Sequence, residues 1–222
     1  MAEYSPMMQH YLATKAEYKD CILFYRLGDF YEMFFDDALV VSKELELTLT
    51  GKDCGQEERA PMCGVPFHAA ETYINRLVSN GHKVAICEQT EDPALAKGLV
   101  NREVIRVVTP GTLIESTLLP ETRNNYLAAL YSDDGSFGIC FCDISTAYMT
   151  STVITGADAE TLLANELSTY MPREIISNVP FSDIEAVSKW LAEKDGRVLY
   201  SQLPDKFTRE NSDKAHERFG EC

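Results

Sequence analysis

Arg26-Leu27-Gly28-Asp29-Phe30-Tyr31-Glu32-Met33-Phe34-Phe35 is the stretch of this sequence that decides most about its fold. The apolar and aromatic runs 21–27 and 30–35 meet at Gly28-Asp29, a pattern that predicts two strands joined by a turn. Side chains two residues apart in a strand point to the same face, so Phe30 and Glu32 are expected to project together. An aromatic ring beside a carboxylate is usually an ordinary pair of strand residues, but it can also test how firmly a base step is stacked.

The rest of the N-terminal half alternates between helical and extended segments. Ser5 followed by Pro6 predicts a helix that runs to about Tyr18, because Ser is a favoured N-cap and Pro fits the first helical position. Further helices are expected over 36–45 and 68–79, and strands over 46–50, 60–63, 82–88 and 102–109. Strands and helices alternate without a strict βαβ order. This predicts an α/β (α+β) domain over residues 1–112, with a mixed β-sheet flanked by helices.

The C-terminal half has the pattern of a second domain. Residues 113–124 carry turn residues and little periodicity, so we expect a linker there. Three strands over 126–131, 137–144 and 147–154, separated by short turns, predict an antiparallel meander. Two helix–strand pairs are then expected over 158–170, 173–176, 183–193 and 197–200, and a last helix over 207–218. This order resembles a ribonuclease H-like α/β domain, which we expect to occupy residues 125–222.

The formal net charge of −15 at pH 7 limits what the chain can do. Proteins that bind DNA on their own usually have a basic surface, because neutralising phosphates and releasing counterions supply most of the affinity. The chain therefore either makes no contact with DNA, or supplies a probe while other regions bind the phosphate backbone.

Cysteine usage and hydropathy indicate an intracellular globular chain. The 222 residues suffice for one large or two modest domains. No run of about 18 apolar residues and no charged-then-apolar leader occurs, so we expect a cytoplasmic protein that does not enter a membrane. The seven cysteines are odd in number and include no C-x-x-C pair, which favours reduced structural thiols over disulfides or a bound metal.

Five blocks of the N-terminal half follow one another in an order that resembles one known family. They are Ser5-Pro6-Met7-Met8-Gln9-His10-Tyr11, Gly28-Asp29-Phe30-Tyr31-Glu32, Pro61-Met62-Cys63-Gly64-Val65-Pro66-Phe67-His68-Ala69, Val84-Ala85-Ile86-Cys87-Glu88-Gln89 and Val107-Val108-Thr109-Pro110-Gly111-Thr112. Together they resemble the N-terminal mismatch-recognition domain of the bacterial DNA mismatch repair protein MutS. The resemblance is dense over 5–112 and weaker over 122–222, which is similar to the beginning of the connector domain of that family.

The resemblance implies a role in DNA mismatch recognition. In the family, the phenylalanine of Gly-x-Phe-Tyr-Glu enters the minor groove at a mispaired or unpaired base and the duplex kinks there; the matching residue here is Phe30. Glu32 matches the glutamate that forms a hydrogen bond to the mispaired base. Arg102 and Arg106 are expected to lie on one face of a strand and are the preferred phosphate contacts. His68 precedes a helix that it could cap, which we expect, or it could meet a phosphate instead.

The resemblance also implies that the chain is a fragment that stops within the connector domain. In the family, lever, clamp and ATPase domains follow the connector. No G-x-x-x-x-G-K-[ST] sequence occurs here, so we expect no enzymatic activity and no cofactor for these residues, and ATP and magnesium for the full-length protein. The implied partners are mismatched double-stranded DNA, MutL through the connector, and a second subunit of the full-length protein. The fragment alone is expected to be monomeric and to bind DNA weakly.

Two other functions remain open. Ribonuclease H-like domains can hold metal ions between carboxylates, and Asp143 ends a strand where such a ligand would lie, so a metal-dependent nuclease is one alternative. The neighbouring strand offers Tyr148, Thr150 and Thr152 instead of further acids. The second alternative is a protein-interaction module without DNA contact, in which Phe30 has no role toward DNA. The acidic composition suits this alternative.

Overall fold

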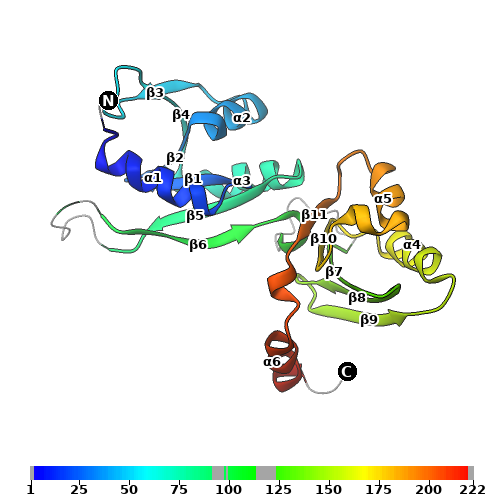
Figure 1. Ribbon diagram of the computed structural model, residues 1–222. Helices are drawn as coiled ribbons and strands as arrows, with labels where there is room; N and C mark the ends of the chain where they lie inside the picture. Colours follow the sequence, from blue (N-terminus) through cyan, green and yellow to red (C-terminus); the bar gives the residue numbers. More distant parts are fainter. Residues whose placement is uncertain (1–2, 92–97, 99, 114–123, 220–222) are drawn as a thin grey trace. The chain divides into compact units, whose positions relative to one another are not determined.

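The computed structural model describes residues 3–91, 98, 100–113 and 124–219, which form two compact units, residues 1–109 and 110–222 (Figure 1). The predicted linker, residues 113–124, lies almost wholly outside the described residues. Each unit has its own sheet and its own buried core. Among the described residues, no helix combines the length and the apolarity needed to cross a membrane.

The first unit is built on a six-stranded sheet with the strand order β3-β4-β2-β1-β5-β6. β1 runs parallel to β5, and all other neighbours in this sheet are antiparallel. The predicted mixed sheet is therefore confirmed. The strands are β1 (Cys21–Leu27), β2 (Phe30–Phe34), β3 (Thr50–Lys52), β4 (Ala60–Pro66), β5 (Lys83–Gln89) and β6 (Arg102–Val108).

Three helices pack on this sheet, α1 (Pro6–Glu17), α2 (Phe35–Leu45) and α3 (Ala70–Ser79). α1 begins as predicted, because the Ser5 hydroxyl accepts a hydrogen bond from the Met8 N–H at 3.4 Å and proline occupies the first turn. One buried cluster joins α1 to alternate residues of the strands; its buried members are Met8, Tyr11, Cys21, Leu23, Tyr25, Phe34, Cys54, Ala60, Ala85 and Cys87. The intervening strand residues point to the opposite face, where α2 packs on β4 and α3 on β5.

Two local predictions are wrong. The strand expected over 46–50 begins only at Thr50, because Glu46 has a left-handed φ of 56° and ends α2 with its N–H bonded to the Ser42 carbonyl. His68 does not cap α3. It lies in a 3-10 turn, Phe67–Ala69, that runs directly into the helix, so the N-cap position falls on Ala69, whose methyl group accepts no hydrogen bond.

Asp37 accepts a backbone hydrogen bond from β1 in the part of β1 that does not pair with β2. β2 pairs only with the last three residues of β1, and the chain turns into α2 at Phe35, which has a positive φ of 51°. The Leu23 N–H of β1 then donates to Asp37 Oδ2 at 2.9 Å, and Lys15 Nζ of α1 lies 2.8 Å from Asp37 Oδ1. This buried carboxylate therefore joins α1, β1 and α2.

The second unit has a five-stranded sheet with the order β11-β10-β7-β8-β9. β7, β8 and β9 form the predicted antiparallel meander, and β10 and β11 continue the sheet parallel to β7. The α/β class predicted for both halves is confirmed. The elements are β7 (Tyr126–Asp133), β8 (Ser136–Asp143), β9 (Tyr148–Ile154), α4 (Ala159–Tyr170), β10 (Glu174–Ser177), α5 (Glu185–Ala192), β11 (Leu199–Gln202) and α6 (Arg209–Phe219).

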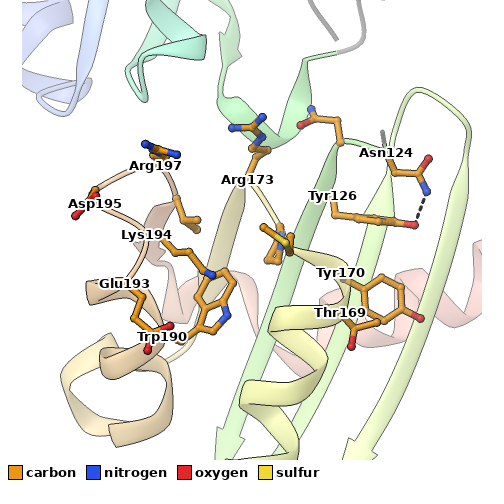
Figure 2. A pocket seen from close by; sticks show the side chains of 14 residues that line it. Asn124, Tyr126, Thr169, Tyr170, Arg173, Trp190, Glu193, Lys194, Asp195 and Arg197 are labelled. Carbon is orange, nitrogen blue, oxygen red and sulfur yellow. Dashed lines mark hydrogen bonds between the residues drawn. The ribbon is translucent and has the colours of Figure 1, made fainter. Parts of the chain in front are cut away.

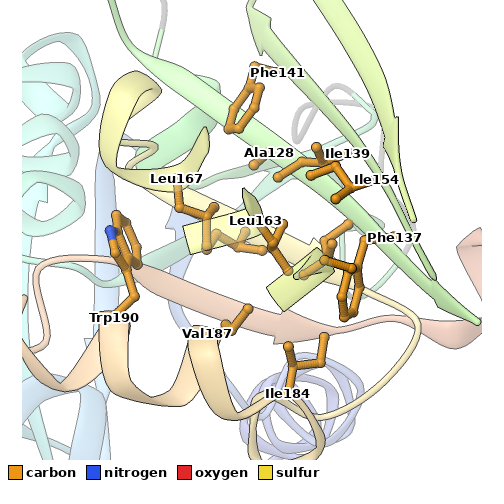
Figure 3. Close-up of a cluster of buried hydrophobic side chains, with 13 residues drawn as sticks. Ala128, Phe137, Ile139, Phe141, Ile154, Leu163, Leu167, Ile184, Val187 and Trp190 are labelled. Atoms are coloured by element: carbon orange, nitrogen blue, oxygen red, sulfur yellow. The ribbon is translucent and has the colours of Figure 1, made fainter. Parts of the chain in front are cut away.

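The core of the second unit lies between its sheet and the helices α4 and α5 (Figure 3). Leu163 and Leu167 of α4 and Val187 and Trp190 of α5 are buried against side chains of β7 and β8. The Trp190 indole N–H donates to the Ser168 hydroxyl at 3.0 Å, which satisfies the polar atom of an otherwise apolar cluster.

Glu174 attaches the beginning of the second unit to its sheet. The Gly111 N–H donates to the buried Glu174 carboxylate at 3.0 Å. A Cβ on Gly111 would lie 2.9 Å from the Glu174 Cβ, closer than real side chains approach. Only glycine therefore lets the chain pass this close to β10.

Replacing Asp37 should destabilise the first unit. Asp37→Ala leaves the Lys15 ammonium and the Leu23 N–H without their shared acceptor, and removing one member of such a buried set costs about 3 kcal/mol of unfolding free energy. The loss is measured from urea unfolding curves. Asp36→Ala is the matched control, since Asp36 lies in the same helical turn but is exposed and should cost less than about 1 kcal/mol. Equal losses for the two variants would contradict the role given to Asp37.

Candidate nucleic-acid interface

The β1–β2 hairpin presents Phe30 at the end of the sheet. Gly28 has a φ of 58°, as the first central residue of a type II′ turn does, and the register pairs Leu27 with Phe30. The Phe30 side chain is 46% exposed, whereas Tyr31 and Met33 are 7% and 0% exposed. The structure thus leaves one aromatic ring accessible on a strand that is otherwise largely buried.

Glu32 lies on the same face of β2 as Phe30 and is held by a lysine from β3. Lys52 Nζ donates to Glu32 Oε2 at 2.6 Å, and the two side chains are 33% and 15% exposed. Gly64 of β4 lies opposite Glu32, and a Cβ on Gly64 would be 3.5 Å from Glu32 Cγ. The absence of a side chain there leaves room for Glu32 to lean over β4 toward β3.

Arg26 holds the hairpin turn from the other face of the sheet. Its Nε donates to the Gly28 carbonyl, and its Nη1 lies 3.1 Å from Glu88 Oε1. Its guanidinium carbon is 3.8 Å from the centroid of the Phe67 ring, which is 43% exposed. The Phe67 N–H also donates to a carbonyl of the turn at 2.9 Å. Arg26 therefore fixes the turn, and its guanidinium is engaged within the protein.

Tyr31 anchors the strand beneath the exposed ring. Its hydroxyl donates to Glu88, and its ring centroid lies 5.9 Å from that of Phe24. Burial, and then the adjacent Glu88 carboxylate, raise the pKa of Tyr31 above its ordinary value. Tyr31 therefore stays a neutral donor, and β2 is firmly held one residue after Phe30.

Arg102 and Arg106 do not lie on one face of β6, so that prediction is wrong. β5 residues Ile86 and Cys87 pair with Arg106 and Val104, which leaves Ile105 as an extra residue on β6. This β-bulge reverses the alternation of side chains along the strand. The two arginines consequently point to opposite faces of the sheet.

Only one of these two arginines is accessible. Arg102 is buried, with its Nε bonded to the Arg26 carbonyl at 2.8 Å, its Nη1 bonded to the Val100 carbonyl at 2.7 Å, and its guanidinium over the Tyr25 ring. Arg106 is exposed on its strand. Arg102 therefore supports the β1–β2 hairpin from within the domain, and Arg106 is the one of the pair whose side chain is accessible.

Lys52 and Phe67 are not among the predicted site residues. Lys52 belongs to a segment that resembles a loop in sequence, and only the pairing of β3 with β4 carries it toward Glu32. A local pattern does not encode that long-range register. Phe67 follows Pro66 at the end of one of the five blocks, and this aromatic residue could have been singled out from that position.

Asp143 serves the turn after β8. Its Oδ1 accepts hydrogen bonds from the Ser145 N–H and hydroxyl at 3.0 and 2.6 Å, and its Oδ2 accepts one from the Asn125 N–H at 3.2 Å. Burial alone would raise the pKa of Asp143, but these hydrogen bonds hold it below its ordinary value. Across the described ranges, no three His, Cys, Asp or Glu side chains gather as metal ligands would, so nothing there favours the nuclease alternative.

The second unit also has a pocket of about 720 Å³ near the N-terminal ends of β7 and β10 (Figure 2). Aromatic side chains and charges of both signs line it; they include Tyr126, Tyr170, Arg173, Trp190, Glu193, Lys194, Asp195 and Arg197. Lys194 Nζ lies 4.7 Å from the Trp190 ring centroid. Because charged side chains of both signs line it, the pocket does not select a ligand of one charge.

The two arginines of β6 should differ in their effect on stability. Arg102→Ala removes the donors of two partly buried carbonyl groups and the packing on Tyr25, which should cost about 2 kcal/mol of unfolding free energy. Arg106→Ala, the exposed control on the same strand, should change it by less than about 0.5 kcal/mol. Urea unfolding of both variants measures the difference. A neutral Arg102→Ala variant would argue against the interior position of this side chain.

Comparisons with known proteins agree with this architecture. Residues 5–117 match the family model of MutS domain I, and residues 125–221 match that of MutS domain II. DNA mismatch repair protein MutS from Acetivibrio thermocellus is 56% identical over 207 residues, or 93% of this chain. MutS proteins from Ruminiclostridium cellulolyticum and Lachnoclostridium phytofermentans are each 60% identical, over 80% and 82% of the chain.

The chain spans a small part of these curated relatives. It covers 24% of the Acetivibrio protein, 20% of the Ruminiclostridium protein and 19% of the Lachnoclostridium protein. The two family models together account for most of the chain and fall on its two halves. The chain therefore belongs to the MutS family and carries its domains I and II.

Proposed function

We propose that this chain recognises mispaired and unpaired bases in double-stranded DNA, as part of a longer DNA mismatch repair protein. The observation that carries the proposal is the Phe30 ring, 46% exposed on a hairpin whose neighbouring residues Tyr31 and Met33 are buried. This ring occupies the position that the Gly-x-Phe-Tyr-Glu motif of the family gives to the residue inserted into DNA.

Insertion of Phe30 would compare the stacking strength of different base steps. Unstacking a step costs a few kcal/mol, and less where a base is mispaired or has no partner. Phe30 stands on a strand that is fixed by Tyr31 and by the turn, so inserting the ring costs little ordering of the protein. The quantity that is read is the deformability of the duplex, which explains how one site could accept many different mismatches.

Glu32 would contact the base next to the inserted ring, because both side chains project from the same face of β2. An ionised carboxylate is repelled by phosphates and therefore disfavours close approach to sound DNA. In its protonated form the same group can donate a hydrogen bond to a purine ring nitrogen. Glu32 would thus discriminate between duplexes more than it attracts them.

The phosphate backbone would be bound largely by other domains. The chain carries a net charge of −15, and Arg26 and Arg102 are engaged within the first unit. Arg106 remains an exposed candidate for one phosphate contact. The relatives are about four times longer or more, and in the full-length protein we assign DNA binding by clamp and lever, dimerisation, and ATP hydrolysis with magnesium to the remaining domains.

For the second unit we propose the connector role, including the contact with MutL. The edge strand β9 supports a protein-binding role, because it exposes the apolar side chains Met149 and Val153, at 47% and 76%. Apolar side chains at a sheet edge suit a protein partner better than phosphates. In this proposal the first unit probes DNA while the second communicates with other proteins.

Removing the Phe30 ring should abolish mismatch preference. In the full-length protein, Phe30→Ala should weaken heteroduplex binding by roughly 10- to 100-fold, the equivalent of one lost base–aromatic stacking contact, and change homoduplex binding little. Both duplexes are titrated at one salt concentration with the same flanking sequence. Leu39→Ala is the matched control, because Leu39 is an apolar residue of the same unit with 47% exposure.

Two outcomes would speak against the probe. A Phe30→Ala variant that retains its preference for heteroduplex would remove the aromatic ring from the mechanism. Equal losses on heteroduplex and homoduplex, with a lowered unfolding temperature, would indicate damage to the domain instead of loss of a DNA contact.

Neutralising Glu32 should lower the preference for heteroduplex over homoduplex without weakening the binding of homoduplex. Glu32→Gln removes the repulsion between the carboxylate and the phosphates. The variant should therefore bind homoduplex at least as tightly as the wild-type protein does. The ratio of heteroduplex to homoduplex affinity should fall roughly tenfold, about 1.4 kcal/mol, as expected for one charged hydrogen bond. The ratio is measured by competition between the two duplexes. An unchanged ratio in this variant would refute the discriminating role of Glu32.

A further inference from the structure

We infer that Lys52 is a specificity-determining residue of the mismatch probe, which competes with the mispaired base for the Glu32 carboxylate. The inference rests on the proposed function and extends it to a residue on a different strand. Its basis is the ion pair of 2.6 Å between Lys52 Nζ and Glu32 Oε2. Within the described part of the chain, Lys52 is the one cation at ion-pair distance from this carboxylate.

The pair is placed where DNA binding would disturb it. Glu32 shares its face of β2 with Phe30, so a base that meets the ring also meets the carboxylate. The Glu32 side chain is 15% exposed and that of Lys52 is 33% exposed, so the ammonium is the more accessible partner. A base edge that bonds Glu32 therefore competes with Lys52: a base N–H must replace the ammonium as donor, and a base nitrogen that accepts from protonated Glu32 removes the charge that holds the ammonium.

This competition sets a threshold for the base contact. Charge-assisted hydrogen bonds are stronger than neutral ones, so a base that bonds Glu32 bears the cost of the bond to Lys52 that is given up, and a base that makes no such contact does not. A mispaired base that offers Glu32 a good partner offsets the cost, whereas a sound pair, whose Watson–Crick edges are occupied, does not. While the pair is intact, the ammonium also compensates the repulsion between Glu32 and the phosphates.

The position of Lys52 lets its ammonium move from the Glu32 carboxylate to a phosphate oxygen. It ends β3, a three-residue strand at the edge of the sheet, and the described loop that follows is mostly exposed. A lysine carries a compact charge on a four-carbon stem and has no fixed bonding plane, so it can turn from a carboxylate to a phosphate oxygen. Its only ring neighbour in the described structure is Phe34, with Nζ 6.0 Å from the ring centroid, which is too distant to hold it strongly.

The test is the ratio of heteroduplex to homoduplex affinity in the full-length protein, measured by competition at fixed salt. Lys52→Met keeps the length of the side chain and removes its charge. We expect the ratio to rise about three- to tenfold, because homoduplex loses the compensating charge and the base no longer displaces a competitor. Lys52→Arg keeps the charge and can bond the Glu32 carboxylate through two N–H groups, so it should keep the ratio at or below the wild-type value. Lys43→Met is the matched control, an exposed lysine on α2 that should leave the ratio unchanged.

Measuring Lys52→Met in the Glu32→Gln background separates competition for the Glu32 carboxylate from the simple loss of the Lys52 charge. If Lys52 acts through Glu32, the double variant Glu32→Gln/Lys52→Met should have the same ratio of heteroduplex to homoduplex affinity as Glu32→Gln alone. Any effect of Lys52→Met in that background should then be equal for the two duplexes. A Lys52→Met ratio that stays at or below the wild-type value would overturn the inference. If Lys52→Met raised the affinity ratio by the same factor in the Glu32→Gln background, the inference would also be overturned, because the lysine would then act directly on DNA.

Phe30→Ala, assayed in parallel, distinguishes the two levels of the proposal. If Phe30→Ala keeps the preference for heteroduplex, the proposed function itself is wrong. If Phe30→Ala abolishes the preference while Lys52→Met leaves the ratio unchanged, the probe stands and only the role of Lys52 is lost. Unfolding temperatures within experimental error of wild type for Lys52→Met and Lys52→Arg exclude damage to the domain as the cause of any change.

Discussion

The two-residue turn at Gly28-Asp29 is the constraint on which the arrangement of the first unit depends. It pairs Leu27 with Phe30, and this register sends Tyr31 and Met33 into the core between the sheet and the helices α2 and α3. One residue more or fewer in the turn would exchange the two faces of β2 along its whole length. The positive φ of Gly28 is what makes so short a turn possible. Exposure of Phe30 and burial of Tyr31 and Met33 are therefore consequences of the same turn.

Charged side chains of the first unit serve mainly to position one another. Asp37 joins α1, β1 and α2 through Lys15 and the Leu23 N–H, and Arg26 bonds the Gly28 carbonyl of the hairpin turn and pairs with Glu88 of β5. Arg26 lies beside the surface proposed to meet a polyanion, yet its guanidinium is engaged within the protein. An acidic domain can nevertheless act on DNA, provided that it reads the duplex by insertion and leaves most of the electrostatic attraction to other domains.

Local patterns in the sequence predict most of the fold and part of the site. The hairpin, the mixed sheet and the meander follow from apolar runs and turn residues, and the placement of Phe30 and Glu32 on one face follows from strand alternation. The bulge at Ile105 has no local signature, so the faces of Arg102 and Arg106 could not be predicted. The contact of Lys52 with Glu32 depends on the pairing of β3 and β4, which lies beyond the reach of any local pattern.

The irregularity in β6 has a further consequence for a strand at the margin of its sheet. Among the described residues β6 has a neighbour on one side only, and it exposes Ile105, at 62%, and Val107, at 36%. A regular apolar strand in that position would be a template for intermolecular pairing and fibril growth. The extra residue breaks the ladder of free peptide groups, and Arg106 adds a charge beside it. Protection against self-assembly is thus obtained by the same distortion that buries Arg102 and turns Arg106 away from it.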